Sequence, residues 1–156
     1  MLSDGGVYDN LGIETAWKRH RTILVSDGGA RMQPEKAPAN DWVRHSVRIM
    51  NVIDNQVRSL RKRQVIASFQ TGARKGAYWG IRTDIAHYGL DDALPCPHDR
   101  TLELAEVKTR LEALPARLQK RLVNWGYAVT DAAMRRHVDP GLPAPGGFPY
   151  PTVRIG

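Results

Sequence analysis

The sequence predicts an α/β protein that has few strands and several helices. Segments typical of strands and stripes with helical spacing follow one another along the 156 residues, which is the length of one domain. Only two clear strand segments and one weaker one can be found, too few for a self-sufficient central sheet of ordinary size. We therefore expect the chain to be the last part of a larger α/β domain.

The first elements are short. Ile13–Arg21 has the composition of a helix, and the compact apolar run Thr22–Ser26 is typical of a buried strand. Asp27-Gly28-Gly29 follows as a turn at the strand end. Residues 31–41 contain two prolines and predict a loop, whose last residue, Asp41, is a good N-cap for a helix.

Trp42–Arg63 carries the strongest helical pattern in the chain. Its apolar residues recur at steps of three and four, and arginines gather on the other side (apolar stripe: Val43, Val47, Met50, Ile53, Val57, Leu60). We expect this stripe to pack on the sheet with the arginines outward. A basic amphipathic helix lying on an anionic membrane surface is the alternative.

The second half alternates again between strand and helix signals. Gln64–Gln70 is rich in β-branched and aromatic residues and predicts a strand, and residues 71–85 predict a loop or hairpin leading into another short strand. After an irregular stretch at 84–100 come two helices, at Thr101–Leu114 and Pro115–Arg136. The second has an inner stripe (Leu118, Leu122, Trp125, Val129). Residues 139–156 are rich in proline and glycine and predict a disordered or extended tail.

The composition indicates which classes of partner and which cellular compartment to expect. The net charge of +7 favours an anionic partner, either nucleic acid or an acidic membrane surface, although a solvated basic face would give the same count. Cys96 is the single cysteine, which favours a reducing compartment. No window is apolar enough for a membrane span and no signal peptide is visible, so we expect a cytoplasmic protein.

Several kinds of site lack their signatures in this sequence. No serine lies in G-x-S-x-G, the tight turn of a nucleophile elbow, and neither a dinucleotide-binding nor a P-loop glycine pattern occurs. His87, Cys96 and His98 cluster in sequence, but their spacing matches no zinc pattern. We therefore expect neither a cofactor nor a metal.

An aspartate before two glycines occurs twice, in SDGG at Ser3–Gly6 and at Ser26–Gly29. The glycines allow a sharp turn and leave the carboxylate uncrowded, so it can take a proton from a serine hydroxyl on another loop. The same tripeptide is also a common turn in which the aspartate accepts a backbone hydrogen bond. Spacing alone does not decide between these two interpretations.

The stretch SDGGVYDNLG resembles the motif of the patatin-like phospholipases, whose catalytic dyad is a serine and an aspartate in D-G-G or D-G-A. LVSDGGA, NQVRSLRKRQVI, GAYWGI, TRL and NWGYA are also similar to the second half of bacterial members. The resemblance covers residues 2 to about 136 and implies the C-terminal portion of a three-layer α/β/α domain, with the Pro/Gly-rich tail at 139–156 outside it.

Within this resemblance, Asp4 matches the dyad aspartate, which activates the serine without a histidine between them. Gly5 and Gly6 match the turn that positions it. Asp9 and Asn10 match the polar pair that follows, for which we expect loop shaping rather than chemistry. Asp27 falls in the later segment, where we expect a strand-end turn.

The resemblance implies a lipid acyl hydrolase that acts on lipid or acyl esters, with peripheral membrane contact left open. The family's serine elbow and glycine-rich oxyanion loop have no counterpart in these 156 residues. We therefore expect a C-terminal fragment that needs a missing N-terminal half and shows little or no activity alone. The alternative is a basic module that binds nucleic acid or an anionic membrane surface, although no recognition motif indicates a specific nucleic acid.

Overall fold

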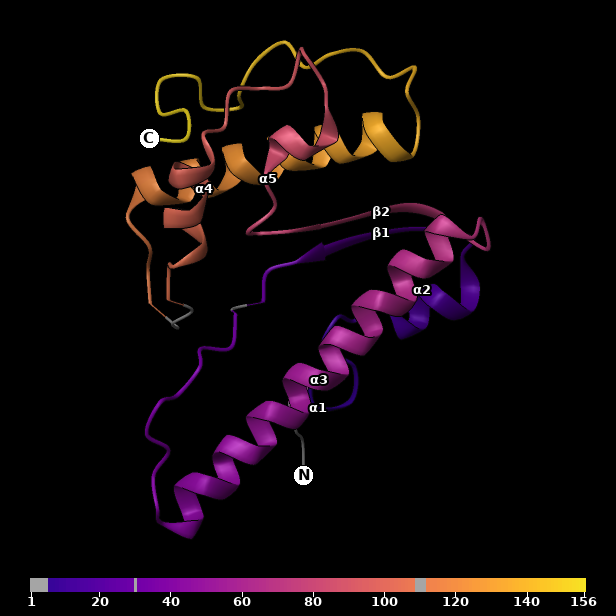
Figure 1. Cartoon of the computed structure of the whole chain (residues 1–156). Coiled ribbons are helices and arrows are strands. Elements are labelled where there is room, and N and C mark those ends of the chain that lie inside the picture. Colours follow the sequence, from indigo (N-terminus) through magenta and orange to yellow (C-terminus); the bar gives the residue numbers. More distant parts are fainter. Residues whose placement is uncertain (1–5, 30, 109–111) are drawn as a thin grey trace. The chain divides into compact units, whose positions relative to one another are not determined.

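The computed structural model describes residues 6–29, 31–108 and 112–156. It confirms an α/β fold with few strands and several helices (Figure 1). The elements in chain order are α1 (Gly6–Asp9), α2 (Glu14–Arg19), β1 (Thr22–Asp27), α3 (Trp42–Gln70), β2 (Lys75–Gly80), the 3-10 helix η1 (Ile85–Tyr88), α4 (His98–Ala105) and α5 (Ala116–His137).

The chain divides into two compact units. The N-terminal unit contains the described residues up to Ile23 and those from 31 to Lys75, and therefore α1, α2 and α3. The C-terminal unit contains Leu24–Gly29 and Gly76–Gly156, and therefore most of both strands, η1, α4 and α5.

Helix α3 begins where the sequence predicts and ends later. Asp41 is the N-cap, with extended backbone angles and a carboxylate oxygen that accepts the Arg44 N–H at 2.9 Å. The predicted strand at Gln64–Gln70 is wrong, because these residues form the last two turns of α3. Strand propensity is a weak preference, and a growing helix gains one backbone bond for each residue added. Thr71 ends the helix, and Gly72 takes the positive φ of +71° that follows.

The apolar stripe of α3 is exposed, contrary to the expectation that it packs on the sheet. Met50 is 68% exposed and Ile53 is 54% exposed, and the rest of the stripe is likewise open (Val43, Val47, Val57, Leu60). Only Val65 and Ser68, near the C-terminal end, are buried in this helix. The sheet of the described chain has only two strands. Such a sheet is too narrow to cover the whole apolar stripe of a 29-residue helix.

Strands β1 and β2 form a parallel pair. The Lys75 N–H donates to the Arg21 carbonyl at 3.0 Å near the start of both strands, and the Ile81 N–H donates to the Asp27 carbonyl at 2.9 Å beyond their ends. Thr22–Ser26 is a strand as predicted, but only its alternate residues are buried, and Leu24 on the other face is 48% exposed. β1 is therefore half-buried rather than fully buried.

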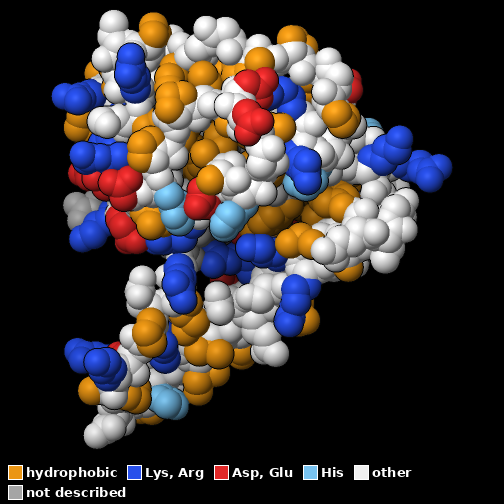
Figure 2. Space-filling view, turned by 45° about the horizontal axis from the view of Figure 1, so that its top comes forward, with side chains coloured by type: hydrophobic (Ala, Val, Ile, Leu, Met, Phe, Trp, Pro, Cys, Tyr) orange, Lys and Arg blue, Asp and Glu red, His pale blue; other side chains and the backbone are white. Residues whose placement is uncertain are grey.

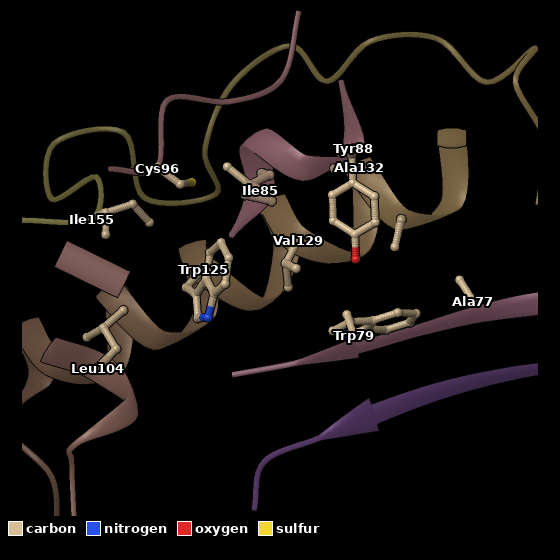
Figure 3. Close-up of a cluster of buried hydrophobic side chains, with 12 residues drawn as sticks. Ala77, Trp79, Ile85, Tyr88, Cys96, Leu104, Trp125, Val129, Ala132 and Ile155 are labelled. Atoms are coloured by element: carbon tan, nitrogen blue, oxygen red, sulfur yellow. The ribbon is translucent and has the colours of Figure 1, made fainter. Parts of the chain in front are cut away.

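A hydrophobic core fills the C-terminal unit between β2 and α5 (Figure 3). Trp79 and Ala77 point from β2 toward α5, whose Trp125 and Val129 point back, as the predicted inner stripe requires. The Trp125 indole N–H also donates to the Ile81 carbonyl at 3.1 Å. η1 and α4 pack on α5 and contribute further buried side chains to this core (Ile85, Tyr88, Leu104).

Two predicted boundaries in this unit need correction. The predicted irregular segment at 84–100 contains η1, which Asp84 caps by accepting the Ala86 N–H at 3.0 Å. The helix predicted at Thr101–Leu114 begins at His98 and ends at Ala105, and no described residue from 106 to 114 is helical. Residues 109–111 of the predicted helix lie outside the described residues. Val107 is β-branched and lowers the helix propensity beyond Ala105.

The tail after Asp139 has no helix or strand, but it is packed rather than disordered. Ile155 is only 2% exposed and belongs to the core (Figure 3). Phe148 is partly buried and packs against the same cluster. The Arg121 guanidinium donates to the Ile155 carbonyl. A few apolar anchors and backbone partners on α5 are enough to order a segment whose composition predicts none.

Candidate active site

The motif that resembles the dyad loop lies at the start of the described chain. Asp4 and Gly5 fall outside the described residues. Gly6 begins helix α1, which ends at Asp9, and Asn10 follows it in a turn. Four of the motif's residues thus form a short helix, which residues 10–13 connect to α2.

Asp9 fixes the path of the chain from α1 into α2. Its Oδ2 accepts the backbone N–H of Glu14, the first residue of α2, at 2.7 Å. Its carbonyl accepts the N–H of Gly12 at 3.0 Å, and Gly12 has the φ of +62° that favours glycine. The Glu14 N–H would otherwise have no partner within the helix, so the carboxylate takes the place of a side-chain cap.

Asn10 ties the same loop to α3. Its Nδ2 donates to Oδ1 of Asp54 at 3.1 Å, across 44 residues of sequence. Among the described atoms, Asn10 Oδ1 and Asp9 Oδ1 are buried and have no hydrogen-bond partner. Each residue therefore makes one side-chain hydrogen bond that holds the loop and keeps one oxygen unused, and a loop-shaping role stays a prediction.

Tyr8, Glu14 and Lys18 form a surface network beside this loop. The Lys18 ammonium donates to the Glu14 carboxylate, and the Tyr8 hydroxyl lies near the same carboxylate. Lys18 and then Tyr8 lower the pKa of Glu14, and Glu14 in turn raises the pKa values of Tyr8 and Lys18. Glu14 is therefore a carboxylate at neutral pH, while Tyr8 keeps its proton.

Sequence reasoning missed this network. The spacing of Glu14 and Lys18, four residues apart on one helix face, was the signal that could have revealed the ion pair. Tyr8 had no comparable signal, because its approach to Glu14 depends on the turn between α1 and α2.

A cavity of ≈ 590 Å³ opens beside the motif, within the N-terminal unit. Gly6, Tyr8 and Asn10 line one side, and α3 supplies the other (Met50, Asn51, Ile53, Asp54, Val57). Three of the five α3 residues are apolar, and the polar pair Asn10 and Asp54 lies among them. Such a lining suits a ligand that is apolar along most of its length and polar at one end.

The second SDGG copy is architectural, as predicted. Asp27 ends β1, and its Oδ1 accepts the Gly29 N–H at 2.9 Å, the hydrogen bond of an Asx turn. Its Oδ2 accepts the Tyr78 hydroxyl at 2.6 Å, and its carbonyl accepts the Ile81 N–H. Every oxygen of Asp27 is thus used to join the two strands and their turns.

The soft ligands His87, Cys96 and His98 do not form a three-ligand site in the described residues, although His87 also approaches the Asp84 carboxylate, at 3.9 Å. Cys96 is buried in the C-terminal core, and burial raises the pKa of its thiol to about 12. His98 lies 3.7 Å from the Asp84 carboxylate, and no cluster of three potential metal ligands occurs in the described ranges.

No protein-family model, curated protein or solved structure matches this chain. Across the described ranges, none of the helices combines the length and the apolar character needed to cross a membrane.

Proposed function

We propose that this chain supplies the aspartate half of the Ser-Asp dyad of a patatin-like lipid acyl hydrolase. Asp4 is the proposed dyad residue, and Gly5 and Gly6 form the turn that positions it. The single observation that carries the proposal is the anchored loop beside an apolar cavity. Two side-chain hydrogen bonds, between Asp9 and α2 and between Asn10 and α3, hold the end of the motif that begins with Asp4 and Gly5.

The proposed chemistry needs two groups besides Asp4. A serine hydroxyl, supplied by a G-x-S-x-G segment that these 156 residues do not contain, attacks the acyl carbonyl carbon while Asp4 accepts its proton. Backbone N–H groups of a glycine-rich loop stabilise the oxyanion, each by about 3 to 4 kcal/mol where such donors have been removed. Water then hydrolyses the acyl-serine ester and releases the fatty acid.

The cavity supports a lipid or another acyl ester as the substrate. Met50, Ile53 and Val57 offer an apolar lining to a hydrocarbon chain, and such burial contributes about 0.8 kcal/mol per methylene. The polar residues of the same cavity, Asn10 and Asp54, suit the ester end or the headgroup. The proposal includes a cytoplasmic location, which the single cysteine favours.

The test compares the chain alone with the chain complemented by the polypeptide encoded upstream of it in the same frame. Alone, the 156-residue protein should hydrolyse a nitrophenyl acyl ester no faster than buffer. With a complement that carries G-x-S-x-G, hydrolysis and fluorophosphonate labelling of the serine should appear.

Asp4→Asn should abolish the hydrolysis of the complemented protein, because it removes the proton acceptor. Asp27→Asn is the matched control: it changes the same residue in the second SDGG copy and keeps a carbonyl oxygen as a hydrogen-bond acceptor. Equal loss in both variants, full activity in Asp4→Asn, or turnover by the chain alone would overturn the proposal.

A further inference from the structure

Helix α3 presents a long apolar stripe that the N-terminal unit leaves exposed over most of its length, with Gly6, Tyr8 and Asn10 facing part of it across the cavity described above. Trp42 at its start is 79% exposed, Met50 is 68% exposed, and Leu60 five turns along is still 52% exposed. Single exposed apolar side chains are ordinary, but a continuous stripe over most of a 29-residue helix marks an interaction surface.

The same helix is strongly cationic. It carries six basic residues and a single acidic one, Asp54, which already binds Asn10 (basic residues: Arg44, Arg48, Arg58, Arg61, Lys62, Arg63). The nearby acids Asp41 and Glu35 lie 3.6 and 3.4 Å from Arg44 and Arg48 at the N-terminal end. The cluster at 58–63 gives the C-terminal half a dense positive charge. Figure 2 shows hydrophobic side chains with Lys and Arg side chains beside them, over the lower part of the view where the N-terminal half of α3 lies.

Among the surfaces that could cover such a stripe, an anionic lipid surface matches both of its properties. A second copy of α3 would bring six like cations against six, which costs association free energy. Nucleic acid would satisfy the cations through its phosphates but would leave the apolar stripe in water. An anionic bilayer surface accepts apolar side chains below the headgroups and attracts arginine and lysine at the headgroup level.

We propose that α3 lies in the plane of an anionic membrane surface, with its apolar stripe inserted among the acyl chains. Trp42, Met50 and Ile53 enter the interface, and the basic residues reach the lipid phosphates and carboxylates. This proposal stands on α3 itself and does not depend on Asp4 being catalytic.

The test is sedimentation of the full 156-residue chain with vesicles. Vesicles of phosphatidylcholine with about one-third phosphatidylserine should bind the chain at least tenfold more strongly than phosphatidylcholine alone, and added salt should weaken the binding. The fluorescence that Trp42 contributes, obtained as the difference between the wild type and Trp42→Phe, should shift to shorter wavelength on binding.

Two variants with the same change in charge separate the stripe from the basic face. Ile53→Asp places the new carboxylate on the face of Met50 and Val57, whereas Ser59→Asp places it on the face of Lys62 and Arg63. Both positions are exposed, so both variants should keep the helical circular dichroism of the wild type. We expect about tenfold or greater loss of vesicle binding for Ile53→Asp and only a few-fold loss for Ser59→Asp.

Four results would overturn the proposal: no binding to anionic vesicles, equal loss in the two variants, concentration-dependent dimers that Ile53→Asp abolishes, or oligonucleotide binding as strong as vesicle binding. Vesicle binding that disappears when the complementing polypeptide of the hydrolase test is present would also overturn it, because a protein segment would then be the occupant of the stripe. A failure here leaves the comparison of Asp4→Asn with Asp27→Asn unaffected.

Discussion

The side chain of Asn124 holds the backbone of Tyr150, 26 residues further along the chain. Asn124 Oδ1 accepts the Tyr150 N–H at 2.9 Å, while Nδ2 donates to the carbonyls of Tyr150 at 2.9 Å and Arg154 at 2.8 Å. Asn124 itself is fully buried on α5. A single amide thus satisfies three backbone groups of the tail.

Replacing Asn124 by alanine should strongly destabilise the C-terminal unit. The change removes the side-chain partner of the Tyr150 N–H and of the Arg154 carbonyl, while the Tyr150 carbonyl keeps the N–H groups of Val153 and Arg154. We expect this loss to lower the free energy of unfolding by about 3 kcal/mol. Gln119→Ala is the control, because Gln119 is an exposed amide on the same helix and should change stability by less than about 0.5 kcal/mol. Urea unfolding measures both, and similar values would contradict a specific role for Asn124.

Ile155→Ala should also be destabilising, although the residue is next to the last in the sequence. Its side chain is 2% exposed within the core cluster, and loss of a buried isoleucine side chain costs about 2 to 4 kcal/mol. Thr152→Ala, at an exposed position of the same tail, should be nearly neutral. A neutral Ile155→Ala would mean that the tail does not pack on the core in solution.

These contacts explain which parts of the fold could be read from the sequence. The start of α3 and the turn at Asp27 follow from local chemistry, since the cap at Asp41 and the Asx turn involve residues two or three positions away. The inner stripe of α5 follows from helical spacing.

Features that depend on distant partners could not be read in the same way. The packed tail depends on Asn124 and Arg121, and the anchored dyad-like loop depends on Asp54 of α3. The strand prediction for Gln64–Gln70 was wrong for another reason. Its β-branched and aromatic residues favour a strand in isolation, but helix α3 extends through them. For the candidate site, the loop-shaping role of Asp9 and Asn10 stays a prediction, and the sequence could not indicate their partners in α2 and α3.

The thiol of Cys96 should be inert in the folded protein. Burial raises its pKa to about 12, so almost no thiolate is present at pH 8, and the reagent has no access to the sulfur. A thiol-specific reagent such as dithionitrobenzoate should react with the native protein far more slowly than with the protein in urea. Ala86→Cys combined with Cys96→Ala provides an exposed control thiol that should react at once. Rapid reaction of native Cys96 would contradict this burial.

Asp92 should make the free energy of unfolding depend on pH in the acid range. The Arg135 guanidinium, which donates to Asp92 at 2.5 Å, lowers the pKa of that carboxyl below its ordinary value of 3.8. The unfolded state then binds the proton more tightly, so the stabilisation is fully present above about pH 4 and is lost as the pH falls through the folded pKa.

Asp92→Asn should therefore lower the urea midpoint at pH 7, and the difference from the wild type should shrink at pH 3. Asp91→Asn, an adjacent exposed position, controls for the change in net charge. A wild-type-to-variant difference that stays constant over this pH range would show that the ion pair does not carry the effect.

Two valines on α3 allow stability and surface binding to be measured separately. Val65 is 0% exposed and Val47 is 54% exposed, so Val65→Ala should cost about 2 kcal/mol in urea unfolding while Val47→Ala should stay within about 0.5 kcal/mol. Binding to anionic vesicles should show the opposite order, because Val47 belongs to the exposed stripe and Val65 is already buried within the protein. Equal effects of the two substitutions on stability would contradict the different burial of the two ends of α3. A stronger effect of Val65→Ala on vesicle binding would mean that the stripe is not the surface that meets the lipid.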